Sequence, residues 1–110
     1  METKTFEKAT ILNFPKLVEY SDNGITSKRV LEKSTGNVTL FSFDQGQKLS
    51  EHTAPFDALI QVLEGEAQIT INHEPHHLKA GEAIIMPANI PHAVDALGKF
   101  KMLLTMIKEA

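Results

Sequence analysis

The side chains best suited to chemistry in this 110-residue chain are two histidines, His52 and His92. His52 stands between Gly46 and Gly65, with five residues separating it from the first glycine. His92 follows Pro87 in a second segment that also begins at a glycine. Imidazole can bind a transition metal, transfer a proton near neutral pH or form a neutral hydrogen bond. Brought together, the two side chains would bind a metal ion or anchor a small ligand.

Composition removes several classes of function. There is no cysteine, which excludes disulfides, thiolate zinc sites and cysteine nucleophiles. The eleven Lys and Arg residues are scattered, and the net charge is −3 with neutral histidines, so no basic stripe for a nucleic acid exists. The beginning of the chain has no apolar signal core, and no apolar run approaches membrane-spanning length. We therefore expect a cytoplasmic protein that acts on neither nucleic acid nor membrane.

The elements that must position these histidines are short strands. Ala67, Ile69 and Ile71 alternate with polar residues, which indicates a strand with one buried face. Turn signals such as Asn23-Gly24 recur at close spacing, and no amphipathic helix of ordinary length lies between them. The predicted strands cover residues 17–20, 25–33, 38–44, 58–63, 67–71, a short segment ending at 79, then 83–86, 92–97 and 100–107. This pattern predicts an all-β sandwich or barrel.

The two framed segments together resemble the paired motifs of the cupin family over residues 38–107. The first cupin motif carries two histidines and a glutamate, and the second carries a further histidine. Here the outer histidines are present as His52 and His92. The second histidine position holds Ala54, and the glutamate position holds Ala58. The resemblance implies a cupin-type double-stranded β-helix, which is a jelly-roll barrel.

The resemblance also implies a domain organisation. Residues 1–110 would form a single cupin domain, with the conserved barrel over residues 37–110. Residues 1–36 would supply N-terminal strands, and because small cupins usually form homodimers we expect these strands to make dimer contacts. In the second motif, Asn89 replaces a turn glycine and Ala96 replaces an asparagine. Asparagine tolerates left-handed backbone better than most residues, so the turn at position 89 remains feasible.

Strand parity predicts which side chains face a pocket inside the barrel. Residues two apart on a strand share a face, so Ala58, Ile60 and Val62 lie on one side. By the same rule Val94 shares a face with His92. Two imidazoles would then look into a cavity lined by small and apolar groups. The predicted lining residues are His52, Phe56, Asp57, Ala58, Met86 and His92.

A metal bound by His52 and His92 alone would have two neutral ligands and no anionic one. We expect at most a weakly held divalent transition metal, drawn from Zn, Ni, Cu, Fe or Mn, with the usual order of affinities favouring Ni, Cu or Zn over Fe. Asp57 lies one position before the glutamate position of the cupin motif. A β-bulge would turn it inward and complete a two-histidine, one-carboxylate iron site, whereas regular strand parity points it away.

Three classes of function follow from this pattern. The leading hypothesis is a barrel that binds a small organic molecule, with a weakly held divalent metal at His52 and His92 or with none. The alternative is a metal-dependent enzyme of the dioxygenase, isomerase or decarboxylase type, which would use His52, His92 and Asp57. In the third class the surface matters more than the pocket, as in a scaffold protein. Met86, Met102 and Met106 are candidates to line the pocket, although core filling is the default interpretation because methionine packs readily into irregular gaps.

Overall fold

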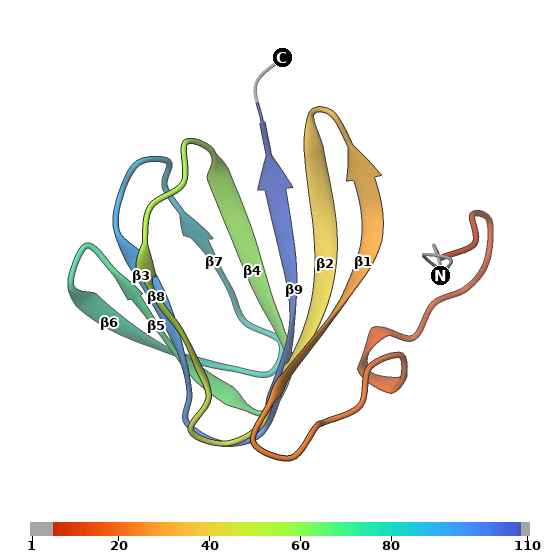
Figure 1. Cartoon of the computed structure of the whole chain (residues 1–110), viewed down its shortest axis with the longest axis horizontal. Coiled ribbons are helices and arrows are strands. Elements are labelled where there is room, and N and C mark those ends of the chain that lie inside the picture. The colour runs from red at the N-terminus through yellow and green to blue at the C-terminus, as the bar shows by residue number, and fades with distance from the viewer. Residues whose placement is uncertain (1–5, 109–110) are drawn as a thin grey trace.

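Nine β-strands form two antiparallel sheets that face one another in the computed structural model, which describes residues 6–108 (Figure 1). The strands are β1 (Ile25–Lys33), β2 (Gly36–Phe43), β3 (Lys48–His52), β4 (Asp57–Glu64), β5 (Glu66–Ile71), β6 (Glu74–Lys79), β7 (Ala83–Met86), β8 (His92–Ala96) and β9 (Phe100–Ile107). One sheet has the order β1-β2-β9-β4-β7, and the other has the order β3-β8-β5-β6. The predicted all-β, cupin-type jelly roll is confirmed.

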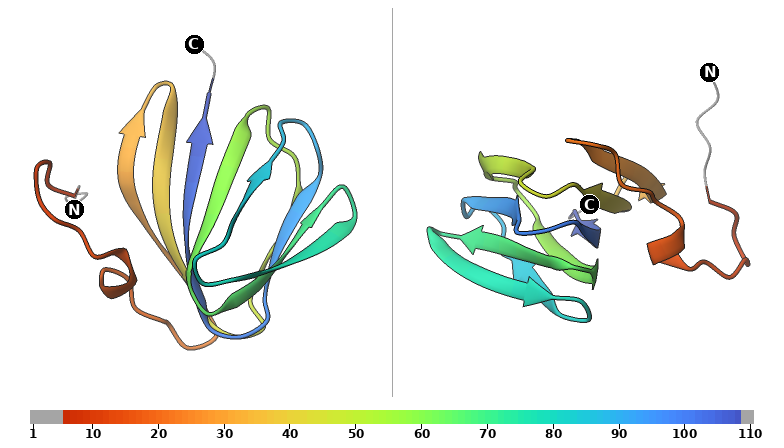
Figure 2. Two further views of the ribbon diagram at one scale, coloured as in Figure 1. Left: turned by 180° about the vertical axis from the view of Figure 1, so that it is seen from behind. Right: turned by 90° about the horizontal axis from the view of Figure 1, so that it is seen from below.

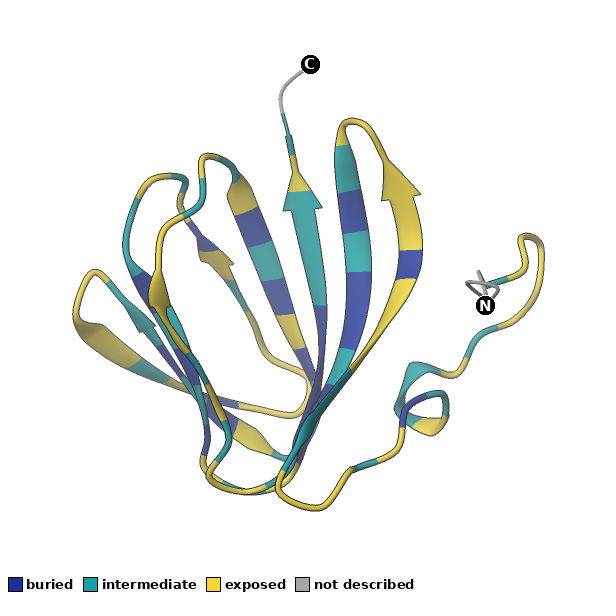
Figure 3. Ribbon diagram, viewed as in Figure 1, coloured by how far each residue is buried: buried dark blue, intermediate teal, exposed yellow. Residues whose placement is uncertain are grey.

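The core lies between the two sheets and follows the period of two in each strand (Figure 3). In β4, Ala58, Ile60 and Val62 are buried at 5% exposure or less, as parity predicts, while Gln61 between them is exposed. Burying each large apolar side chain stabilises the fold by roughly 1.5–3 kcal/mol. Burial of these apolar side chains is therefore the main interaction that holds the two sheets together.

The N-terminal segment differs from its prediction. Residues 17–20 form no strand; instead a 3-10 helix, η1 (Phe14–Lys16), is followed by extended chain along the outer face of the five-stranded sheet. Pro15 suits the first turn of a helix because its φ is fixed and its missing N–H has no partner there. Val18 is 1% exposed and packs with Leu40 and Leu103. The segment thus packs against part of this outer face, on the β1 side of the sheet (Figures 1 and 2).

The chain connections bring four strand ends to one end of the barrel. β3 ends at His52 and β4 begins at Asp57, while β7 ends at Met86 and β8 begins at His92. In Figure 1 the two sheets diverge toward this end and converge at the other. The two connecting loops are joined, because the backbone N–H of Asn89 donates to the Ala54 carbonyl at 2.7 Å. We call the end of the barrel that contains His52, Asp57, Met86 and His92 the open end.

Gly65 closes the β4–β5 turn and is a position where only glycine fits. Its φ is +79°, and a Cβ there would overlap the Lys99 carbonyl oxygen and lie 2.9 Å from the Phe100 Cα. Gly46 has a similar φ of +84°, but a Cβ there would meet nothing within 4 Å. Substitutions at the two glycines therefore distinguish two costs in stability: left-handed backbone alone at Gly46, and left-handed backbone plus a steric clash at Gly65.

We expect Gly46→Ala to lower the free energy of unfolding by about 1–2 kcal/mol, the usual cost of left-handed backbone in a residue with a Cβ. Gly65→Ala should cost clearly more, since the backbone near Lys99 must also move. Equilibrium denaturation of both variants measures the difference. Equal costs would show that the contact at Gly65 is relieved without strain.

Candidate functional site

The two histidines meet at the open end of the barrel. His52 and His92 are register partners across the β3–β8 pair, and their Nε2 atoms lie 3.2 Å apart. The ring centroids are 4.4 Å apart with an angle of 71° between the planes. His92 is 6% exposed, whereas His52 is exposed. The structure thus brings together the two residues that the sequence singled out.

Backbone carbonyls fix the hydrogen positions on both rings. His52 Nδ1 lies 2.7 Å from the Ser50 carbonyl oxygen, and His92 Nδ1 lies 3.2 Å from the Ile90 carbonyl oxygen. A carbonyl only accepts hydrogen bonds, so each Nδ1 carries the proton in the neutral ring. In neutral rings each Nε2 then keeps a lone pair, and the two Nε2 atoms are close enough to share a proton in a hydrogen bond or to bind one ion. This is the arrangement in which proteins hold histidines for metal binding.

Electrostatics favour the neutral form of His92. Burial lowers its pKa from the ordinary value of 6.5, and the neighbouring His52 lowers it further. The hydrogen bond to the Ile90 carbonyl acts in the opposite direction but is the smaller effect. His92 therefore presents an unprotonated Nε2 at neutral pH, which is the form that binds metal.

Behind the pair lies a small enclosed cavity of about 50 Å³. Its lining is apolar except for the two imidazoles. The lining residues are Leu49, His52, Ala54, Ala58, Ile60, Met86, His92, Val94, Met102, Leu104 and Met106. Pockets for drug-sized molecules occupy about 300–1,000 Å³. This cavity has room for an ion with a few water molecules, or for a ligand group of a few atoms.

Four of the six predicted lining residues, His52, Ala58, Met86 and His92, line this cavity, and Phe56 and Asp57 do not. Asp57 is exposed, and its Oδ1 accepts a hydrogen bond from the Ala88 N–H at 2.8 Å. Phe56 lies in the loop before β4 with the Lys108 ammonium 5.5 Å from its ring centroid. The register of β4 is regular at Asp57, so the bulge needed to turn its carboxylate inward is missing there and parity points it outward.

Seven further residues line the cavity and were absent from the predicted lining set: Leu49, Ala54, Ile60, Val94, Met102, Leu104 and Met106. Parity with the histidines and Ala58 already placed Ala54, Ile60 and Val94 on the inward faces of their strands. Alternation along the last strand would have found Met102, Leu104 and Met106 once its inner face was known. Leu49 had no such signal, because the register of β3 is irregular between Leu49 and His52.

The cupin domain model matches residues 39–108. This chain belongs to the cupin family. A conserved protein of unknown function from Streptococcus pyogenes is similar to it, with 34% identity and a TM-score of 0.92 over 100% of this chain and 96% of that one. A cupin superfamily protein from Desulfitobacterium hafniense has 28% identity and a TM-score of 0.89, covering 99% and 100% of the two chains.

A cupin 2 conserved barrel domain protein from Leptotrichia buccalis has 42% identity and a TM-score of 0.85 over 88% of this chain. The match covers 47% of that protein, so this chain corresponds to about half of its length. None of the curated proteins matches this chain. Within residues 6–108, no helix has the length and apolar character needed to cross a membrane.

The full ligand set of a cupin metal site does not fit the residues of this cavity. Across the described part of the chain, no group of three or more His, Cys, Asp or Glu side chains lies close enough to hold a metal ion. Ala54 and Ala58 stand where the family pattern has a histidine and a glutamate. His52 and His92 remain as the two nitrogen donors, and nitrogens 3.2 Å apart can both reach one ion through bonds of about 2.0–2.1 Å.

The depressed pKa of His92 gives stability a defined pH dependence. The unfolded chain binds a proton on this residue at a higher pH than the folded protein does, so protonation favours unfolding. This contribution to the free energy of unfolding is present above pH 6.5 and is lost as the pH falls below it.

In metal-free His52→Ala, the electrostatic effect of His52 on His92 is absent, so the pKa of His92 should rise. It should remain below 6.5, because burial is the larger cause. NMR titration of the His92 ring measures both values, and an unchanged pKa in the variant would contradict the pairing.

Proposed function

We propose that this cupin binds one transition-metal ion at His52 and His92, and that a small organic ligand reaches the ion through the adjoining cavity. The observation that carries the proposal is the pair of Nε2 atoms 3.2 Å apart, each made available by a carbonyl bond at Nδ1. Two neutral donors without a carboxylate should hold divalent ions weakly, with Ni, Cu and Zn ahead of Fe and Mn. Remaining positions on the ion would be open to water or to ligand.

The size and chemistry of the cavity limit the ligand. About 50 Å³ admits a group of a few atoms, and the walls offer apolar side chains and two ring nitrogens. An organic ligand would therefore bind through a small donor group at the ion, with a short apolar portion against the walls. A bound ion would also supply a Lewis acid at the cavity mouth.

The enzymatic alternative depended on Asp57 as a third ligand or a general base. Its carboxylate is bound to the Ala88 N–H on the outer side of β4 and does not line the cavity. A general base must come within hydrogen-bonding reach of the proton it removes. This position supports binding rather than Asp57-dependent turnover of the dioxygenase, isomerase or decarboxylase type.

Removing either imidazole should abolish the site. We expect His52→Ala and His92→Ala each to lower the affinity for Ni²⁺ and Zn²⁺ at least tenfold, since one ligand of two is lost. His73→Ala is the control for surface imidazoles, since its side chain is 71% exposed, and Asp57→Asn is the control for the outward carboxylate; both should bind as the parent does. Titration calorimetry on chelator-treated protein gives the affinities. Equal binding by all four variants would refute the site.

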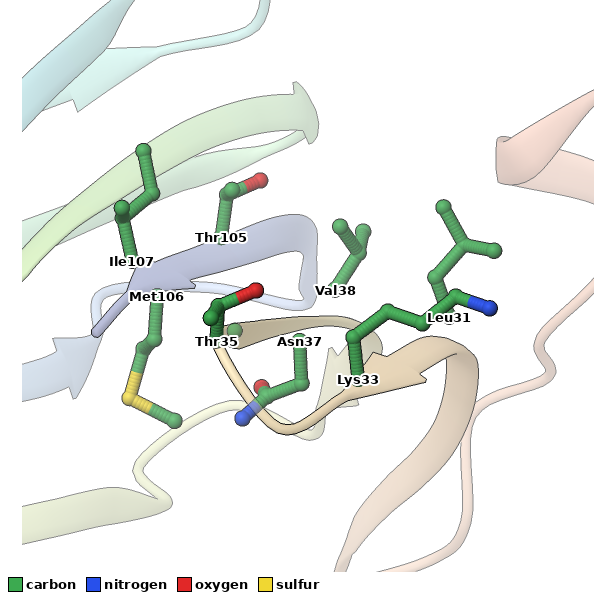
Figure 4. A pocket seen from close by; sticks show the side chains of 9 residues that line it. Leu31, Lys33, Thr35, Asn37, Val38, Thr105, Met106 and Ile107 are labelled. Carbon is green, nitrogen blue, oxygen red and sulfur yellow. The ribbon is translucent and has the colours of Figure 1, made fainter. Parts of the chain in front are cut away.

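We also propose a homodimer, formed through the outer face of the five-stranded sheet. One register row crosses all five strands on this face. Its members are Leu31, Val38, Thr105, Leu59 and Ile85. Figure 4 shows Leu31, Val38 and Thr105 on one side of the sheet. Leu31 and Ile85 are 49% and 63% exposed, which is unusual for large apolar side chains in the same row.

A second copy fits this face better than an unrelated partner does. The neighbouring row carries Lys33 at one end and Asp57 at the other, with Gly36 and Ile107 between them. A two-fold axis running along β9 would place Lys33 of each copy near Asp57 of the partner subunit. Such self-complementarity is what an isologous interface requires. The N-terminal segment packs on this face around Leu40 and Leu103, so the dimer contacts would include β1 rather than residues 6–24.

Ile85→Lys should convert the dimer to a monomer, because it places a charge among the exposed apolar side chains of this row. Ile11→Lys is the matched control, since Ile11 is 98% exposed and lies outside the sheet. Sedimentation velocity at several concentrations reports the mass of each variant. A parent protein that sediments as a monomer at all of them would contradict the proposal.

A further inference from the structure

Two methionines flank the position where the cupin pattern has its glutamate. Ala58 is the register partner of Met86 on β7 and of Met106 on β9. The three residues form one row across the five-stranded sheet, and all three line the cavity behind the histidines. The small alanine side chain therefore lies between two thioether side chains.

This row lies at the same end of the barrel as the histidine pair. Met86 is the last residue of β7 and His92 is the first of β8, while His52 ends β3 just before β4 begins. The cavity that all these side chains share has a volume of only about 50 Å³. Met86 is 4% exposed, so its sulfur is held inside the barrel. Two imidazoles from one sheet thus face two thioethers from the other across a small space.

We infer that Met86 and Met106 complete the histidine pair into a soft site that selects monovalent copper, Cu(I). The inference rests on the proposed metal binding at His52 and His92 and specifies which ion the site takes. Thioether sulfur is a soft donor that favours Cu(I), and imidazole also binds copper. Hard ions such as Mg²⁺ and Mn²⁺ favour carboxylate and carbonyl oxygen, and no carboxylate lines this cavity.

Charge favours a monovalent ion at this place as well. The cost of moving an ion from water into an apolar cavity scales with the square of its charge, so a monovalent ion incurs about a quarter of the cost of a divalent one of equal size. The lining contains no anionic side chain to offset that cost. The replacement of a glutamate by Ala58 thus removes the charge that a divalent ion needs.

Met106 also contacts a second pocket outside the cavity. It lines the inner cavity and a second pocket of about 300 Å³ at the ends of β2 and β9. In Figure 4, Met106 and Asn37 project from one side of the sheet, whereas Val38, Thr105 and Ile107 project from the other. The Oδ1 atom of Asn37 is buried without a hydrogen-bond partner.

The test separates copper binding from simple core filling. Leucine has nearly the volume of methionine but no sulfur, so Met86→Leu and Met106→Leu keep the packing and remove the donors. Met102→Leu is the matched control, because Met102 lines the same cavity two inward-facing positions deeper along β9, opposite Val62. Affinity for Cu(I) is measured in reducing buffer by competition with a colorimetric Cu(I) chelator, and affinity for Zn²⁺ is measured on the same samples.

We expect the parent to bind one Cu(I) more tightly than Zn²⁺. Met86→Leu and Met106→Leu should each weaken Cu(I) binding at least tenfold, while Zn²⁺ binding stays unchanged in both and Met102→Leu behaves as the parent. X-ray absorption of the Cu(I)-loaded parent should show copper–sulfur scattering, which the double variant should lose.

Three results would overturn the inference. Unchanged Cu(I) affinity in the double methionine variant, or an absorption spectrum without sulfur, would reduce both residues to core filling. The proposed function would survive that result if Zn²⁺ binding still required His52 and His92. Failure of the parent to bind either ion would refute the inference and the proposed function together.

Discussion

The antiparallel pairing of β4 with β7 on one side and β9 on the other sets the geometry on which the rest of the barrel depends. Because the side-chain period of a strand is two, this register fixes the facing of every β4 residue at once. Ala58 faces the cavity between Met86 and Met106, and Asp57 must then face outward. A slip of one residue would exchange them and give a different site. The position of one carboxylate thus follows from the packing of the whole core.

Opposite this row, the histidine pair is held in an arrangement that two neutral imidazoles would not favour alone. Each Nδ1 is committed to a carbonyl, and the two Nε2 atoms lie 3.2 Å apart, each with a lone pair in the neutral ring. Neighbouring lone pairs repel, and a cation between them relieves the repulsion. The burial of His92 lowers its pKa and so favours the neutral ring. Core packing and backbone hydrogen bonds together hold the two imidazoles in this arrangement.

The fold could be predicted from the sequence because its signals are local. Period-two alternation in segments such as residues 67–71 and turn residues at close spacing are sufficient to define short strands. The N-terminal segment was harder, since the residues around Val18 alternate like a strand yet cover the sheet without pairing into it. For the site, spacing and parity indicated the histidines and Ala58, and these residues line one cavity. Asp57 needed a β-bulge to face inward, and the register of β4 is regular there, whereas Phe56 lies in the loop before β4 where strand parity does not apply.

The contribution of β9 to the cavity depends on long-range register, which local patterns do not contain. Met106 is adjacent to Ala58 only because β9 lies between β2 and β4 in the sheet.

Anomalous diffraction from crystals grown with a transition metal is the most direct test of metal binding at His52 and His92. We expect one strong anomalous-difference peak within about 2.0–2.1 Å of the Nε2 atoms of both His52 and His92. Peaks only at surface histidines such as His73 and His77, with none between the pair, would contradict it.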